Sequence, residues 1–132
     1  MSRPAYVDTS AAVKLVRRER STAGLIDHLL AAPARMSSEL LAIELRCAVR
    51  HLERPELLEL VDEVLSALDL IPLGGAIHAR AAAAFDPPQR ALDAIHLATA
   101  LSVPTDDLDF VTYDDRQALA AEAAGLTVVT PV

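Results

Sequence analysis

Four acidic residues occupy positions that an ordinary surface charge does not explain. Asp8 directly follows the apolar pair Tyr-Val, and Asp114 follows Phe-Val-Thr-Tyr in the same way. Glu44 lies within Leu-Leu-Ala-Ile-Glu-Leu, and Asp93 lies within Leu-Asp-Ala-Ile-His-Leu-Ala. A carboxylate among apolar neighbours must be paired, protonated or bound to a cation.

The chemistry of such a group follows from its ligand type. Carboxylates gathered in one cleft would repel one another, and a hard cation would offset that repulsion. A site with oxygen ligands alone suits Mg²⁺ or Mn²⁺, whereas Zn²⁺ favours His and Cys. Such a cation lowers the pKa of a bound water and neutralises charge on a phosphate. The residue types therefore point to metal-assisted hydrolysis of a phosphodiester.

Each acid also has a structural explanation, which the sequence leaves open. Asp8 and Asp114 could simply cap the helices that follow them. Asp93 could stabilise the dipole of its helix from the first turn, and Glu44 could border a broad apolar stripe. His96, three residues after Asp93, is expected to be a packed or capped helix histidine.

The apolar runs predict the elements that would position these acids. Strands are predicted at 6–7, 35–37, 70–73, 109–112 and 127–129, and helices at 10–18, 21–30, 38–53, 55–68, 76–84, 89–101 and from about 114 to 125. Alternation of short strands with helices indicates an α/β sandwich around a parallel sheet. Ligands of such sheets bind beyond the carboxyl ends of the strands, where Asp8 would lie. Asp109, at the far end of its strand, is expected to be a loop residue.

Length and composition favour one domain over residues 1–132. The chain is 52% hydrophobic, which suffices for a core, and its aromatic content of 3% means that Ala, Leu and Val must fill it. No apolar run reaches the roughly 18 residues of a membrane span, and the N-terminus has no signal-peptide segment, so a cytoplasmic protein is expected. The single cysteine, Cys47, fits a reducing compartment and is predicted to be a small buried hydrophobe.

The formal net charge of −7 argues against general binding of polyanions, which depends on Lys and Arg. Two divalent cations would offset about four of these charges where a phosphate must lie. The basic side chains that could hold phosphates, or form ordinary surface ion pairs, are Arg17, Arg18, Arg20, Arg46 and Arg50. If the substrate is nevertheless a nucleic acid, this charge predicts weak, structure-selective binding.

The same residues resemble the four motifs of the PIN-domain family. Tyr-Val-Asp-Thr-Ser at 6–10 is similar to the first motif, and Ser-Ser-Glu-Leu-Leu-Ala-Ile-Glu-Leu at 37–45 resembles the second. Leu-Asp-Ala-Ile-His-Leu-Ala-Thr-Ala at 92–100 resembles the third, and Phe-Val-Thr-Tyr-Asp at 110–114 resembles the fourth. The motifs follow in order over nearly the whole chain. With no extra domain, the chain resembles the VapC-type toxins of type II toxin–antitoxin systems.

This resemblance implies a PIN-like three-layer α/β/α sandwich with a five-stranded parallel sheet of order 3-2-1-4-5. It implies that Asp8, Glu44, Asp93 and Asp114 are the catalytic and metal-binding acids of an endoribonuclease that depends on Mg²⁺ or Mn²⁺. The implied partners are an RNA substrate, a VapB-like antitoxin with a basic segment, and a second copy in a homodimer. The helices at 55–68 and 76–84 are candidates for the dimer contact.

Several assignments within this interpretation stay open. Asp115 could replace Asp114 as the fourth acid, and Asp114 is preferred because it continues the Thr-Tyr-Asp match. The hydroxyls of Thr9, Ser10 and Thr112 could orient carboxylates or could only cap helices and turns.

Two other functions compete with the ribonuclease. The first is a non-catalytic PIN-like module that docks a basic partner through its acidic cleft. The second is a phosphotransfer enzyme with Asp8 as nucleophile. It is the weaker of the two because Asp-Thr-Ser lacks a second aspartate two residues further on.

Overall fold

The computed structural model describes residues 2–132 and contains a sheet of five short strands. These are β1 (Ala5–Val7), β2 (Arg35–Ser38), β3 (Asp69–Ile71), β4 (Asp109–Val111) and β5 (Thr127–Val129). The order across the sheet is β3-β2-β1-β4-β5 and every neighbouring pair is parallel, which confirms the predicted topology. The chain changes its direction of winding at β1, so a crevice is expected between the ends of β1 and β4.

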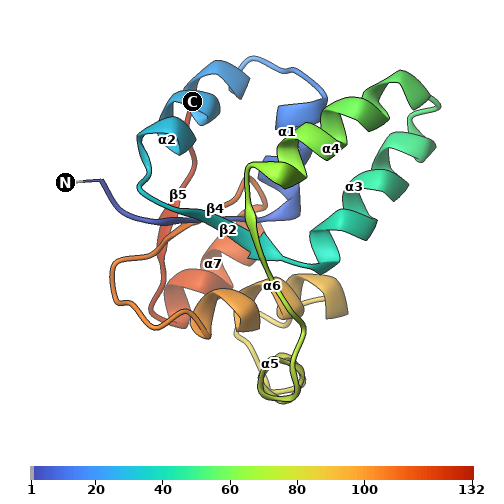
Figure 1. The fold of residues 1–132 in the computed structure, drawn as a ribbon. Helices are drawn as coiled ribbons and strands as arrows, with labels where there is room; N and C mark the ends of the chain where they lie inside the picture. The colour runs from blue at the N-terminus through green and yellow to red at the C-terminus, as the bar shows by residue number, and fades with distance from the viewer. Residues whose placement is uncertain (1) are drawn as a thin grey trace.

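Helices cover both faces of the sheet, so the predicted three-layer sandwich is also confirmed (Figure 1). One layer holds α1 (Thr9–Val16), α2 (Thr22–Ala31), α3 (Leu40–His51), the 3-10 turn η1 (Pro55–Leu57) and α4 (Leu58–Ser66). The other holds α5 (Gly75–Ala81), α6 (Ala91–Leu101) and α7 (Asp115–Ala123). Within residues 2–132, no helix has the length and apolar character needed to cross a membrane.

The two central strands are buried on both faces, because successive side chains of a strand point in opposite directions. Ala5, Val7 and Val111 pack in one core against α1 to α4. Tyr6 and Phe110 lie in the other core beside α6 and α7, with stacked rings whose centroids are 5.5 Å apart. Burial on both faces explains why these strands are continuous apolar runs in the sequence.

Two predictions about single residues are wrong. Cys47 is exposed, because the buried positions of α3 fall every fourth residue from Leu41 to Val49 and Cys47 lies between them. Asp109 is not a loop residue but belongs to the strand, as the predicted range 109–112 had it. It opens β4 with only 5% of its surface exposed, and its Oδ1 accepts a hydrogen bond of 2.7 Å from the Arg3 guanidinium.

Candidate active site

Asp8 lies at the carboxyl end of β1 and has 2% of its surface exposed. It caps α1, because its Oδ2 accepts hydrogen bonds from the Ser10 amide at 3.2 Å and the Ser10 hydroxyl at 2.7 Å. The Thr112 hydroxyl donates to the same oxygen at 3.0 Å. Asp8 Oδ1 is buried and has no hydrogen-bond partner in the described part of the chain. A buried oxygen of this kind is costly unless a further group binds it.

The hydroxyls of Ser10 and Thr112 also hold the turn that follows β4. Ser10 Oγ accepts a hydrogen bond of 2.9 Å from the Tyr113 amide, and Thr112 Oγ1 accepts one of 3.1 Å from the Asp114 amide. The two side chains therefore connect the ends of the central strands and orient the Asp8 carboxylate. Of the two roles that the sequence left open for these hydroxyls, both are present, because they contact a carboxylate and also hold a turn.

Asp114 caps α7 through Oδ1, which accepts a hydrogen bond of 3.1 Å from the Gln117 amide. The structural explanation of this acid is thus correct, but it occupies only one of the two carboxylate oxygens. Asp115 is exposed on the first turn of α7. Because Asp114 is half-buried and its charge acts on Asp93, these positions favour Asp114 as the fourth acid of the cleft.

Glu44 and His96 form a pair between α3 and α6. His96 has none of its surface exposed, and its Nε2 lies 2.7 Å from Glu44 Oε1. The same Nε2 lies 2.8 Å from Thr9 Oγ1, and Nδ1 lies 2.7 Å from the Tyr6 hydroxyl. The carboxylate that stood among apolar residues in the sequence is therefore paired. Thr9 contacts the histidine, a partner that neither of the two roles left open for its hydroxyl included.

Asp93 is half-buried in the first turn of α6. Burial raises the pKa of Asp93, and the negative charges of Asp8 and Asp114 raise this pKa further. Glu44 acts in the same direction, whereas His96 lowers the pKa. The four predicted acids are thus close enough to interact. However, no three His, Cys, Asp or Glu side chains within residues 2–132 already form a set of metal ligands.

Opposing effects act on the buried histidine. Burial lowers the pKa of His96, but the hydrogen bond to Glu44 and the charge of Asp8 outweigh burial, so this pKa lies above the usual value of 6.5. Burial also raises the pKa of the Tyr6 phenol, which therefore keeps its proton. The four acids therefore give the cleft a negative charge, and His96 is a buried basic residue beside them.

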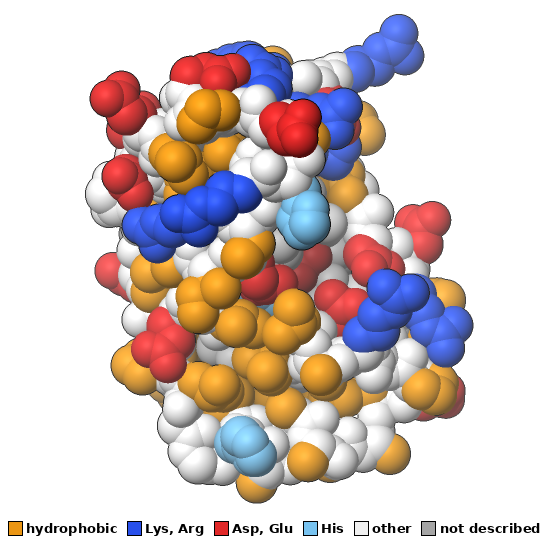
Figure 2. Space-filling model, turned by 90° about the vertical axis from the view of Figure 1, so that its right-hand side faces the viewer, with side chains coloured by type: hydrophobic (Ala, Val, Ile, Leu, Met, Phe, Trp, Pro, Cys, Tyr) orange, Lys and Arg blue, Asp and Glu red, His pale blue; other side chains and the backbone are white. Residues whose placement is uncertain are grey.

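Two features of the cleft suit a hard cation. Its donor atoms are carboxylate oxygens, and one of them, Asp8 Oδ1, has no hydrogen-bond partner among the described residues. Its carboxylates offer only oxygen, the donor that Mg²⁺ and Mn²⁺ prefer. Figure 2 looks onto the carboxyl edge of the sheet and shows acidic side chains in a hollow, with hydrophobic side chains around it and basic ones further out. A cation could therefore be reached from solvent at this edge.

Comparisons with known proteins agree with this geometry. The model of the family described as PIN domain matches residues 5–123. The chain belongs to the PIN-domain family. It is 42% identical over 132 residues to "Ribonuclease VapC35" and 35% identical over 127 residues to "Ribonuclease VapC46", both of Mycobacterium tuberculosis, with 96% of each chain covered. It is thus a VapC-type PIN domain.

A solved structure supports the fold of this PIN domain. In the "Toxin-antitoxin complex from Klebsiella pneumoniae", one chain superimposes on this one with a TM-score of 0.71. The match covers 97% of this chain and 98% of the other at 23% sequence identity. At that identity the likeness concerns the fold alone.

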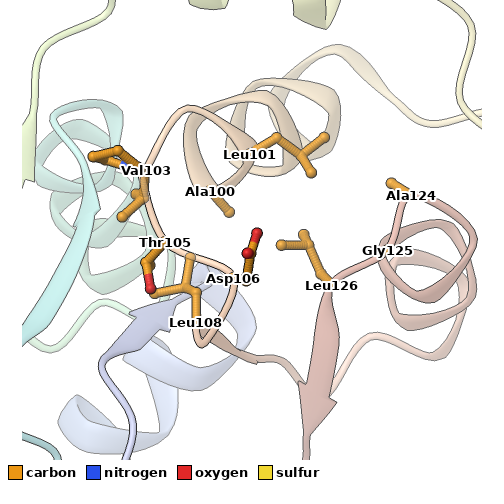
Figure 3. Close-up of a pocket in the computed structure, with 10 residues that line it drawn as sticks. Ala100, Leu101, Val103, Thr105, Asp106, Leu108, Ala124, Gly125 and Leu126 are labelled. Carbon is orange, nitrogen blue, oxygen red and sulfur yellow. The ribbon is translucent and has the colours of Figure 1, made fainter.

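A second hollow of the PIN domain, of about 450 Å³, lies away from the acidic cleft (Figure 3). It is lined by the end of α6, the loop before β4 and the segment between α7 and β5. Apart from Asp106, the labelled side chains carry no acid or base. Without a group of catalytic side chains, this hollow is not a candidate active site.

Gln117, which the sequence did not single out, is fully buried and joins α7 to α6. Its Nε2 donates to the Asp93 carbonyl oxygen at 3.4 Å, and its Oε1 lies 3.2 Å from Thr112 Oγ1. The spacing Asp-x-x-Gln from Asp114 is a known helix-start signature and could have revealed it.

Two arginines close in sequence to Asp93 and Asp114 were not among the predicted basic residues either. Arg90 is the N-cap residue of α6, and Arg116 lies two residues after Asp114 and donates to the Pro88 carbonyl oxygen at 3.1 Å. In contrast, the predicted cluster at 17–20 follows α1, which carries the chain roughly 12 Å from Asp8 at the usual rise of a helix. The guanidinium of Arg46, another candidate, is bound to Asp62 at 2.9 Å.

Asp93→Asn is expected to stabilise the cation-free protein at neutral pH. Because the pKa of Asp93 is higher in the folded protein than in the unfolded chain, stability falls as the pH rises through the interval between the two values. The amide has no charge to be repelled, so its advantage should vanish as the pH falls below the unfolded pKa. Urea unfolding from about pH 3 to about pH 8 measures this difference.

Asp115→Asn is the matched control for this prediction. The exposed Asp115 favours the N-terminus of α7, so its replacement should not stabilise the protein. Equal stability of Asp93→Asn and the parent chain at neutral pH would contradict the electrostatic account.

Proposed function

We propose that this VapC-type PIN domain is the toxin of a type II toxin–antitoxin system and an endoribonuclease that hydrolyses RNA phosphodiester bonds with Mg²⁺ or Mn²⁺. The observation that carries the proposal is the buried Asp8 Oδ1, which has no partner among the described residues, in a group of acids where Asp8, Asp114 and Glu44 all act on Asp93. The ribonuclease names of the relatives support RNA as the substrate.

In this proposal Asp8, Glu44, Asp93 and Asp114 are the catalytic acids and would hold the cation. A bound Mg²⁺ or Mn²⁺ would supply an activated water and neutralise charge on the scissile phosphate. The protein fixes the acids before any ligand arrives. Ser10 and Thr112 hold one oxygen of Asp8, and helix caps fix Asp8 and Asp114.

The remaining parts of the proposal concern the protein's setting. Residues 1–132 would act as one nuclease domain in the cytoplasm, inhibited by a VapB-like antitoxin. A net charge of −7 and an acidic cleft suit an antitoxin segment with Lys or Arg.

Asp8→Asn is expected to lower RNA cleavage by more than about 100-fold, since even residues that only orient a ligand cost roughly 10- to 100-fold when changed. Asn remains a good N-cap, so α1 should keep its stability. Cleavage of a structured RNA with Mg²⁺ or Mn²⁺ measures the loss of activity, calorimetry with Mn²⁺ measures the loss of cation binding, and urea unfolding checks the stability. Asp114→Asn should behave in the same way.

Asp115→Asn is the control in both assays and should cleave as the parent chain does. Cleavage that persists in a chelator or in Asp8→Asn would refute the metal mechanism. Absence of Mn²⁺ binding and cleavage in the parent chain would instead favour the non-catalytic docking module.

Arg90→Gln combined with Arg116→Gln is expected to weaken RNA binding without changing its preference among sequences. These exposed arginines flank the acids, where they can neutralise phosphates next to the cleaved bond. Each lost phosphate contact should reduce the salt dependence of binding by about one unit of slope. Fluorescence anisotropy with an Asp8→Asn background, which should not cut the RNA, measures the affinity.

The matched control for the two arginines is Arg17→Gln combined with Arg18→Gln, which changes two exposed arginines after α1. A larger loss of RNA affinity in this control than in the test variant would overturn the assignment.

A homodimer is expected to form through the face that carries the cleft. Ile43 on α3 is 63% exposed and Leu92 on α6 is 46% exposed, next to Glu44 and Asp93. The exposed residues of α4 are mostly acidic, so the 55–68 helix suits this contact less well. Sedimentation should give about twice the monomer mass of 14.1 kDa. Ile43→Asp should give monomers, and Glu59→Gln on α4 should not.

A further inference from the structure

A chain of three side chains links the inner core of the sheet to the cleft. Tyr6 lies on the central strand β1, His96 lies on α6, and Glu44 lies on α3. Tyr6 and His96 are fully buried, and the Glu44 side chain is 13% exposed. The two hydrogen bonds that connect them are both 2.7 Å long. Hydrogen bonds thus connect Tyr6 in the core, through His96, to Glu44 at the edge of the cleft.

The imidazole has a definite orientation, because its two nitrogens face different groups. Nε2 faces the Glu44 carboxylate, which can only accept a hydrogen bond while it is ionised. A neutral histidine with its proton on Nδ1 would set a lone pair against that carboxylate. Nδ1 instead faces the Tyr6 hydroxyl, which can donate to an unprotonated nitrogen and accept from a protonated one. Nε2 therefore carries a proton whichever charge the ring has.

We infer that Tyr6 and His96 are positioning residues for Glu44. Tyr6 fixes the ring of His96 so that Nε2–H donates to Glu44 Oε1, and this bond holds the carboxylate at the cleft with Oε2 left for a cation. Thr9, whose Oγ1 lies 2.8 Å from Nε2, restricts the ring from the start of α1. The inference rests on the proposed function, because it concerns how the same cleft receives its cation.

This role differs from that of an ordinary core histidine. A packing residue would be replaceable by any side chain of similar volume, with stability as the only quantity affected. A positioning residue must place a hydrogen-bond donor where Nε2 lies. If the side chain at position 96 has no donor there, the Glu44 carboxylate should be free to rotate. Groups that orient a metal ligand typically contribute roughly 10- to 100-fold to metal affinity.

Two variants of His96 separate these roles. The amide nitrogen of Gln reaches about as far from the backbone as Nε2 does, whereas that of Asn lies near the position of Nδ1. His96→Gln should bind Mn²⁺ within about threefold of the parent chain, and His96→Asn should bind it roughly 10- to 100-fold more weakly. Both variants remove the ring, so urea unfolding should show similar losses of stability for the two. Tyr6→Phe should weaken Mn²⁺ binding less than His96→Asn does.

Nitrogen NMR of the ring gives a readout that needs neither cation nor activity. The expected spectrum of the parent chain has a protonated Nε2 across the pH range in which the fold persists. A neutral ring protonated on Nδ1 would overturn the inference. In Tyr6→Phe, Nε2 should stay protonated because Glu44 still faces it, and the ring should become more mobile because the partner of Nδ1 is gone.

Calorimetry of the parent chain with Mn²⁺ separates failure of the inference from failure of the proposed function. No Mn²⁺ binding by the parent chain would overturn both. Binding by the parent chain with equal affinity in His96→Asn, or with equal losses in His96→Asn and His96→Gln, would overturn this inference alone.

Discussion

Repulsion among carboxylates at the carboxyl edge of the sheet is the constraint around which this PIN domain is built. Asp8 and Asp114 terminate or follow the two central strands, and Glu44 and Asp93 approach from helices of opposite layers. Burial raises the pKa of Asp93, and the charges of Asp8, Asp114 and Glu44 raise this pKa further. Such an arrangement is unfavourable for folding alone. It persists because local hydrogen-bond partners fix Asp8, Asp114 and Glu44.

Some of these hydrogen bonds are helix caps, so contacts that stabilise the fold also fix the acids of the site. The Asp8 carboxylate caps α1 with Oδ2 while Oδ1 stays unpartnered among the described residues, and Asp114 caps α7 with one oxygen only. A helix N-terminus also favours negative charge through its dipole, which offsets part of the repulsion. Capping and ligand binding are therefore not alternatives here. The same carboxylate can stabilise a helix and offer an oxygen to a cation.

The two cores connect this edge to the rest of the fold. On one face Val7 and Val111 pack against α1 to α4, and on the other Tyr6 and Phe110 stack beside α6 and α7. Tyr6 belongs both to this packing and to the hydrogen bond with His96. A change in the packing of β1 would therefore reach Glu44 through two hydrogen bonds, which ties the geometry of the cleft to the stability of the sheet.

The sequence by itself determined the fold class and predicted the four acids that interact around Asp93. Strands buried on both faces must be apolar throughout, and an acid at their end or inside an apolar helix stands out against that background. The sequence could not pair Glu44 with His96, since 52 positions separate them and only the packing of α3 against α6 brings them together. Nor could the sequence show which face of α3 is exposed, so it did not predict that Cys47 is exposed. It also did not predict the contact between the buried Asp109 and Arg3. Those contacts depend on where whole elements lie in space, and the tertiary structure alone decided them.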